Sequence, residues 1–228
     1  IIQFNKYGHN IICVDAEETE AIYKKYKDKH NVIPISLKKL SHGVYFKKNY
    51  ILDNYFQNNK RIEIKNISNS LIGSFNIENI LAAYVVSKII KIDIKDFVNV
   101  IKNFRGLKYR MQKIFQNSYF QVINNSKATN INSAINSISV YDNINLILGG
   151  RAKEEDFSKI LNYKKRISKI YLIGESSHMI YKQLNNDIEC EVFKDLEIAS
   201  KKILKDIKSK IDFQTVLFSP ACSSYDQY

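Results

Sequence analysis

Short apolar segments alternate with helix-like segments in the second half of the chain, and this alternation limits the folds that it can adopt. The expected strands after Gly106 are residues 119–124, 145–148, 170–173, 188–193 and 215–218. The expected helices are residues 130–140, a stretch from Phe157, 176–184 and 195–208. Short apolar strands separated by helices are typical of an α/β fold with a parallel sheet. We therefore predict such a sheet for residues 107–228.

The first part of the chain has a different pattern, and Gly106 marks the break between the two. A short strand is expected at residues 11–14, and residues 17–27 have helical spacing. Residues 43–64 contain short β-like runs. Two helices are expected at residues 76–90 and 94–104. The sequence therefore predicts two domains, residues 1–106 and 107–228.

Polar or glycine-rich clusters follow four of the predicted strands in the second part. They are residues 125–129, 149–153, 174–175 and 219–224. In open parallel sheets, ligands bind outside the carboxyl ends of the strands. Free N–H groups at helix starts there attract carboxylates and phosphates. The pattern alone fits a site for a small anionic ligand and ordinary capped loops about equally well.

The charge and composition exclude some classes of protein. The net charge of +12 suggests nucleic-acid binding. The excess is spread as +7 before and +5 after Gly106, however, so we expect no nucleic-acid partner. No run approaches the roughly 20 apolar residues of a membrane span, and no signal peptide is visible. Three separated cysteines favour a reducing, cytoplasmic location.

Five runs of residues, in order along the chain, resemble the motifs of one enzyme family. They are GSFNIENILAA at 73–83, FRGLKYR at 104–110, NSKATN at 125–130, LGGRAK at 148–153 and LFSPACSSYDQ at 217–227. These runs resemble motifs of the Mur ligases, and "SKATN" with "SPACSS" is similar to the branch that adds D-glutamate. The resemblance covers roughly 150 residues.

The resemblance implies a fold and a reaction. Residues 1–106 would be the carboxyl-terminal part of the central ATP-binding domain. Residues 107–228 would be the Rossmann-like, D-glutamate-binding domain, truncated at its end. The enzyme would use ATP and Mg²⁺ to join D-glutamate to UDP-N-acetylmuramoyl-L-alanine through an acyl phosphate, in peptidoglycan synthesis. A monomer is expected.

The resemblance also implies roles for single residues. Contacts with D-glutamate are expected from Lys127, Thr129, Lys153 and Ser224. Contacts with ATP are expected from Asn76, Asn79, Arg110 and Asn125. It assigns no catalytic residue and no metal ligand within this chain, because the family's phosphate-binding loop and most of its Mg²⁺ ligands have no counterpart here. On that ground we expect a fragment that is not competent alone.

Four positions depart from the family pattern. Phe75 and Tyr109 stand where the family has histidine, Gln112 where it has glutamate, and Asn125 where it has aspartate. All four lie where the resemblance implies ATP contacts, or in the hinge that it implies between the two domains, around residues 104–112. Two alternatives therefore stay open beside the ligase. The chain could be an inactive remnant that only binds a ligand, or, on charge alone, a basic nucleic-acid-binding module.

Overall fold

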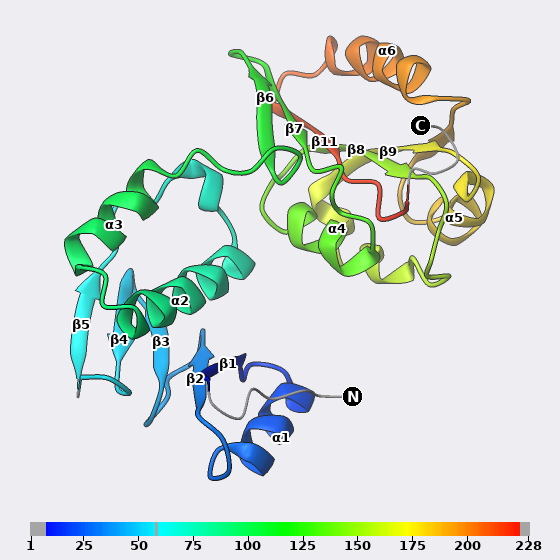
Figure 1. Cartoon of the computed structure of the whole chain (residues 1–228). Coiled ribbons are helices and arrows are strands. Elements are labelled where there is room, and N and C mark those ends of the chain that lie inside the picture. Colours follow the sequence, from blue (N-terminus) through cyan, green and yellow to red (C-terminus); the bar gives the residue numbers. More distant parts are fainter. Residues whose placement is uncertain (1–7, 58, 224–228) are drawn as a thin grey trace. The chain divides into compact units, whose positions relative to one another are not determined.

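The chain folds into two compact units, and the division between them falls after Arg105. The computed structural model describes residues 8–57 and 59–223. The units are Ile1–Arg105 and Gly106–Tyr228 (Figure 1). Gly106 has a φ of 79°, a conformation that glycine adopts readily. No helix in the described part of the chain combines the length and apolar character that a bilayer-spanning segment needs.

A six-stranded sheet forms the centre of the second unit. Its strands are β6 (Gln112–Gln116), β7 (Phe120–Asn124), β8 (Ile144–Gly149), β9 (Ile167–Ile173), β10 (Cys190–Val192) and β11 (Gln214–Phe218). Their order is β10-β9-β8-β11-β7-β6. Neighbours from β10 to β7 are parallel, which confirms the predicted parallel sheet. The edge strand β6, which pairs antiparallel with β7, was not predicted.

Helices cover both faces of this sheet (Figure 1). They are α4 (Ile131–Ile138), the 3₁₀ helix η2 (Ser158–Arg166), α5 (Ser177–Leu184) and α6 (Leu196–Ile207). The first three pack in one core with Leu146 and Leu148 of β8, whereas α6 packs in another core with Ile147. This alternation of side chains along a fully buried strand is the reason that both faces hold helices. The helix predicted from Phe157 is a 3₁₀ helix.

The first unit is built on a five-stranded mixed sheet. Its strands, in spatial order, are β1 (Asn10–Cys13), β2 (Val32–Ser36), β3 (Val44–Lys47), β4 (Tyr50–Asp53) and β5 (Lys60–Glu63). Strands β1 to β3 are parallel, and β3 to β5 form an antiparallel meander. Strand β2 was not predicted, although all five of its residues are buried.

The three α-helices of the first unit match the predicted segments closely, whereas its short 3₁₀ helix was not predicted. These helices are α1 (Glu17–Tyr26), the 3₁₀ helix η1 (Asn69–Leu71), α2 (Ser74–Ile89) and α3 (Ile94–Asn103). In the core, the buried Tyr84 of α2 donates a hydrogen bond of 2.8 Å to the buried Asp53 of β4. Asp53 also accepts from two backbone N–H groups, so this buried carboxylate is satisfied.

Candidate functional site

Three loops of the second unit lie along one edge of its sheet. Strands β8, β11 and β7 are parallel neighbours. The loops that leave their carboxyl ends are residues 149–153, 219–223 and 125–130. Because these ends meet at the same edge, the three clusters are adjacent, and the fourth cluster expected from the sequence, residues 174–175 after β9, lies next to the loop of β8.

Backbone hydrogen bonds tie the three loops together. The Asn125 N–H donates to the carbonyl of Phe218 (2.8 Å), and the Gly149 N–H donates to that of Pro220 (2.9 Å). Arg151 and Ser223 exchange two bonds of 2.8 and 3.0 Å. The loops are therefore held by groups that do not depend on side-chain identity.

Two glycines allow the close approach at the end of β8. Gly149 has a φ of 121°, and a Cβ placed there would lie 2.1 Å from the carbonyl oxygen of Ile173. Gly150 has a φ of 127°, and its Cβ would lie 2.6 Å from the carbonyl oxygen of Ser223. A side chain at either position requires the backbone to move, which explains the Gly-Gly pair.

The structure places three of the four predicted D-glutamate contacts on these loops. Lys127 and Lys153 are exposed, and Thr129 is half-buried. Within residues 8–57 and 59–223, neither lysine forms an ion pair. The next residue, Asn130, caps α4 by accepting from the Ser133 N–H (2.8 Å). Ser224 lies outside the described residues.

A turn of left-handed residues precedes this edge. Tyr109 and Met111 have φ values of 66° and 48°, which are uncommon for residues other than glycine. The exposed Arg110 lies between them. The Tyr109 N–H donates to Oε1 of Gln112 (3.0 Å), and the Tyr109 carbonyl accepts from the Lys127 N–H (3.2 Å). Residues 107–111, called the hinge turn below, are thereby fixed to residues 125–130, called the Lys127 loop.

Asn125 is buried, with 7% of its surface exposed. Its Oδ1 accepts from the Met111 N–H (3.1 Å), and its Nδ2 donates to Oγ of Ser219 (3.3 Å). Both ends of the amide thus have partners within the protein. The predicted contact of Asn125 with ATP stays a prediction.

In the first unit, the predicted ATP contacts Asn76 and Asn79 lie on the first turns of α2. Nδ2 of Asn76 donates to the carbonyl of Ile72 (2.8 Å), and Nδ2 of Asn79 approaches Oδ1 of Asn76 (3.4 Å). The two amides therefore share one face of the helix, as their spacing predicts. Nearby, Phe75 fills the space beside Gly73, where a Cβ would lie 2.5 Å from its ring.

A small acidic cluster, which the sequence analysis missed, lies beside the start of α2. The ligand atoms of Cys13, Asp15 and Glu78 lie within 4.8 Å of one another. Two carboxylates suit Mg²⁺, but Asp15 already accepts from the Ser36 hydroxyl and the Leu37 N–H. Burial raises the pKa of the Cys13 thiol to about 11, so it is neutral. The cluster thus fits a resident metal poorly.

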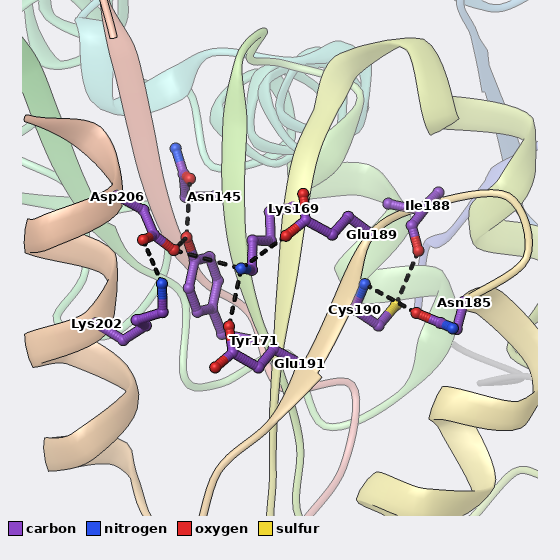
Figure 2. Close-up of polar contacts among 10 residues, drawn as sticks. All are labelled: Asn145, Lys169, Tyr171, Asn185, Ile188, Glu189, Cys190, Glu191, Lys202 and Asp206. Atoms are coloured by element: carbon purple, nitrogen blue, oxygen red, sulfur yellow. Dashed lines mark hydrogen bonds and ion pairs between the residues drawn. The ribbon is translucent and has the colours of Figure 1, made fainter. Parts of the chain in front are cut away.

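A second charged cluster, also missed from the sequence, lies toward the amino ends of β8 and β9 (Figure 2). The Lys169 Nζ is 2.8 Å from carboxylates of both Glu189 and Glu191, and 3.4 Å from that of Asp206. Tyr171 donates a bond of 2.9 Å to the same Asp206. The partners are 20 to 37 residues from Lys169, a spacing that no local pattern reveals.

Comparisons with known proteins agree with this architecture. No family model matches the chain. It is 34% identical over 231 residues to the UDP-N-acetylmuramoylalanine–D-glutamate ligase of Rickettsia bellii, and 31% identical over 230 residues to that of Rickettsia prowazekii. Each match covers 99% of this chain and 51% of the relative. The chain therefore spans about half the length of these curated relatives.

Solved structures of the same fold extend the comparison. MurF from Acinetobacter baumannii matches with a TM-score of 0.70 at 13% identity, over 94% of this chain and 49% of that one. A folylpolyglutamate synthase/dihydrofolate synthase from Yersinia pestis, crystallised with AMPPNP and Mn, matches with a TM-score of 0.59 at 14% identity, over 87% and 47%.

The two sheets, and the loops at one edge of the larger sheet, define an α/β protein with the fold of these solved structures. The chain belongs to the Mur ligase family. Its curated relatives are the members named UDP-N-acetylmuramoylalanine–D-glutamate ligase.

Proposed function

We propose that this chain is part of an ATP-dependent ligase that joins D-glutamate to UDP-N-acetylmuramoyl-L-alanine in peptidoglycan synthesis. The observation that carries the proposal is the meeting of three loops at one sheet edge, with the exposed Lys127 and Lys153 on two of them. The names of the curated relatives support the same substrates. We place the protein in the cytoplasm, as a monomer.

In the proposed reaction, a carboxylate oxygen of the acyl substrate attacks the γ-phosphorus of ATP, and ADP leaves. The amine of D-glutamate then attacks the carbonyl carbon of the acyl phosphate, and inorganic phosphate leaves. Negative charge gathers in both steps, so fixed cations lower the barrier. Mg²⁺ would neutralise charge on the phosphates when bound. We assign no ligand for it in this chain.

The second unit would hold D-glutamate and aim its amine. Lys127 and Lys153 each supply a cation for a carboxylate, and Thr129 and Ser224 supply hydroxyls. Because neither lysine is paired within the described residues, neither has an internal carboxylate to give up when D-glutamate binds. This is a positioning role, which makes the attack effectively unimolecular.

The first unit and the hinge turn would contribute to nucleotide binding. Asn76 and Asn79 present two amides on one helix face, which suits the donors and acceptors of an adenine ring. Arg110 is exposed in the hinge turn, where its guanidinium is available to a phosphate. This chain alone would not complete the reaction.

The experiment is a phosphate-release assay on the intact protein that carries this chain. Phosphate should form from ATP only when both UDP-N-acetylmuramoyl-L-alanine and D-glutamate are present. Equal turnover with glycine or lysine in place of D-glutamate would remove the specificity that we propose.

The four departures from the family pattern support one competing proposal, a remnant that binds ligand without turnover. One of the four departures, Gln112, counts little toward the remnant, because the amide oxygen of Gln112 accepts a hydrogen bond from the Tyr109 N–H, as a glutamate oxygen would. D-glutamate titrated into the 228-residue chain, followed by NMR at Lys127 and Lys153, measures binding separately from catalysis. Binding with no turnover in the intact protein would favour the remnant.

A further inference from the structure

We propose that Asn125 is a positioning residue, which fixes the Lys127 loop against the hinge turn through a buried chain of hydrogen bonds. The claim about D-glutamate rests on the proposed function, whereas the claim about the hydrogen bonds does not. The chain links Met111, Asn125, Ser219 and Ser137 and ends at a carbonyl of α4.

The orientation of the Asn125 amide follows from its neighbours. One end lies 3.1 Å from the Met111 N–H, which can only donate, so this end must be Oδ1. The other end is therefore Nδ2, which donates to Oγ of Ser219 at 3.3 Å. An aspartate carboxylate, which is the family's usual side chain here, would present an acceptor at both ends.

The direction of the remaining bonds follows from counting protons. The Ser137 hydroxyl lies 2.7 Å from the Ala134 carbonyl and 2.9 Å from Oγ of Ser219. It has one proton, and the carbonyl can only accept, so Ser137 donates to Ala134. Ser219 must then donate to Ser137. All the bonds run one way, an arrangement in which each bond strengthens the next.

Burial makes this chain sensitive to a single change. Ser137 and Ser219 are fully buried, and Asn125 is nearly so. An unmatched polar group at such depth is costly, because no water replaces the lost partner. A charged carboxylate at position 125 would force Ser219 to donate to it, and Ser137 would then have to choose between Ser219 and Ala134.

The hinge turn depends on the same residue. Its two left-handed residues hold a sparsely populated conformation, which persists only when surrounding contacts impose it. The hydrogen bond from the Met111 N–H to Asn125 Oδ1 holds Met111 in this conformation. The hydrogen bond from the Lys127 N–H to the Tyr109 carbonyl links the turn to the loop that carries Lys127. Losing the amide should free the turn and move the start of the Lys127 loop.

The first test needs no ligand. In Asn125→Leu, amide hydrogen exchange at Met111 and Lys127 in the 228-residue chain should become about tenfold faster, as for loss of one hydrogen bond. The Ile170 N–H of β9, which donates to the carbonyl of Glu189 just before β10, should keep its exchange rate. Should that variant fold poorly, Ser219→Ala is the second variant. It breaks the series of hydrogen bonds at Ser219 but leaves the Asn125 acceptor of the Met111 N–H in place, so a smaller increase in the exchange rates is expected.

The second test uses the intact enzyme and Asn125→Asp. A neutral carboxylic acid has one donor and one acceptor, as the amide does, whereas the carboxylate has only acceptors. The ratio of the KM for D-glutamate in the variant to that in the wild type should therefore rise severalfold as the carboxyl ionises. The wild type should lack this rise of KM with pH. A merely structural role of Asn125 would not produce the rise in the variant.

Groups around position 125 set where the step falls. The titratable or charged residues on the surrounding segments are Lys108, Tyr109 and Arg110 in the hinge turn, Lys127 in its own loop and Cys222 in residues 219–223. Helix α4 has none. Burial raises the pKa of a carboxyl, and the three exposed cations oppose this through solvent.

The outcomes separate the two proposals. Unchanged exchange at Met111 and Lys127 in both variants, with a flat KM ratio across pH in Asn125→Asp, overturns the positioning role. A wild-type enzyme that ignores D-glutamate, while exchange responds as expected, defeats the proposed function and leaves the hydrogen-bond chain supported.

Discussion

Lysines lie toward both ends of the six-stranded sheet, but the two ends use them differently. Toward the amino end, the Lys169 side chain is only 13% exposed and is surrounded by three carboxylates (Figure 2). At the carboxyl end, Lys127 and Lys153 are exposed, and no ion pair involves them within the described part of the chain. At the amino end the lysine is paired within the fold. At the carboxyl end Arg151 pairs with Glu175 (3.8 Å), whereas Lys127 and Lys153 stay available to a ligand.

The contrast teaches how to recognise a binding lysine in this chain of 35 basic residues. A paired lysine must lose its carboxylates before it can take an anionic ligand, whereas an unpaired one loses only water. The carboxyl end compensates by using backbone groups and glycines for its scaffold. Four changes test this division of roles.

The largest effect is expected at the scaffold of the carboxyl end. Gly149→Ala should lower the free energy of unfolding by about 4 kcal/mol, because a Cβ would meet the Ile173 carbonyl and the φ disfavours any side chain. Urea unfolding followed by circular dichroism measures it. Gly150→Ala should cost less, since its contact is longer. A small loss for Gly149→Ala would mean that side chains hold this edge after all.

At the amino end, Lys169→Met should destabilise the protein by about 2 kcal/mol, because it leaves carboxylates facing one another without their cation, while solvent screens the exposed Glu189 and Glu191 in part. The same unfolding assay applies. Lys201→Met is the matched control. Lys201 pairs with one exposed glutamate, Glu197, within α6, so its replacement should leave stability unchanged. Equal stability of Lys169→Met and wild type would erase the contrast between the two ends.

The lysines of the carboxyl end should show the opposite signature. Lys127→Ala or Lys153→Ala should weaken D-glutamate use in the intact enzyme by about 1.5–3 kcal/mol in kcat/KM, as for loss of a charge-assisted contact. The unfolding midpoint should not move. Lys182→Ala, an exposed lysine of α5, is the control for general charge effects. Unaltered kinetics in both variants would rule out their assignment to D-glutamate.

The smallest effect concerns pH at the amino end. Burial alone would raise the pKa of Asp206, but hydrogen bonds from Lys202 and Tyr171 lower it below its ordinary value. A lowered folded pKa adds stability above the unfolded pKa of about 3.9, and that stability is lost as pH falls through the folded value. This group should therefore contribute a loss of wild-type stability as the pH falls below about 4. Lys202→Met should flatten the drop.

Much of the second unit could be predicted because its strands are short apolar runs between polar loops. The two strands that escaped prediction did so for different reasons. Strand β6 is almost wholly exposed at an edge, so burial does not select its residues. Strand β2 contains Pro34, which argues against a strand interior, yet lies fully buried within a parallel trio.

The site was predictable only in part for a related reason. The positions of Lys127, Thr129 and Lys153 followed from motifs along the chain, and the strand order then brought their loops together. The contacts of Asn125 join residues up to 94 positions apart, and Lys169 meets its partners across strands and a helix. Contacts of this kind depend on tertiary packing, which leaves no local pattern in the sequence.

The place of β11 in the sheet has a consequence for synthesis of the protein. Among the described strands of the unit it is the last to leave the ribosome, yet it lies between β7 and β8 and pairs with both. Until it arrives, the β6–β7 hairpin has no neighbour in the parallel sheet, and the loops at 125–130 and 149–153 lack their backbone hydrogen bonds to residues 218–223. Such long-range closure slows folding. The edge that carries the three loops is therefore completed in a single late step, and a ribosome that stalls before residue 214 leaves the nascent sheet divided into two pieces.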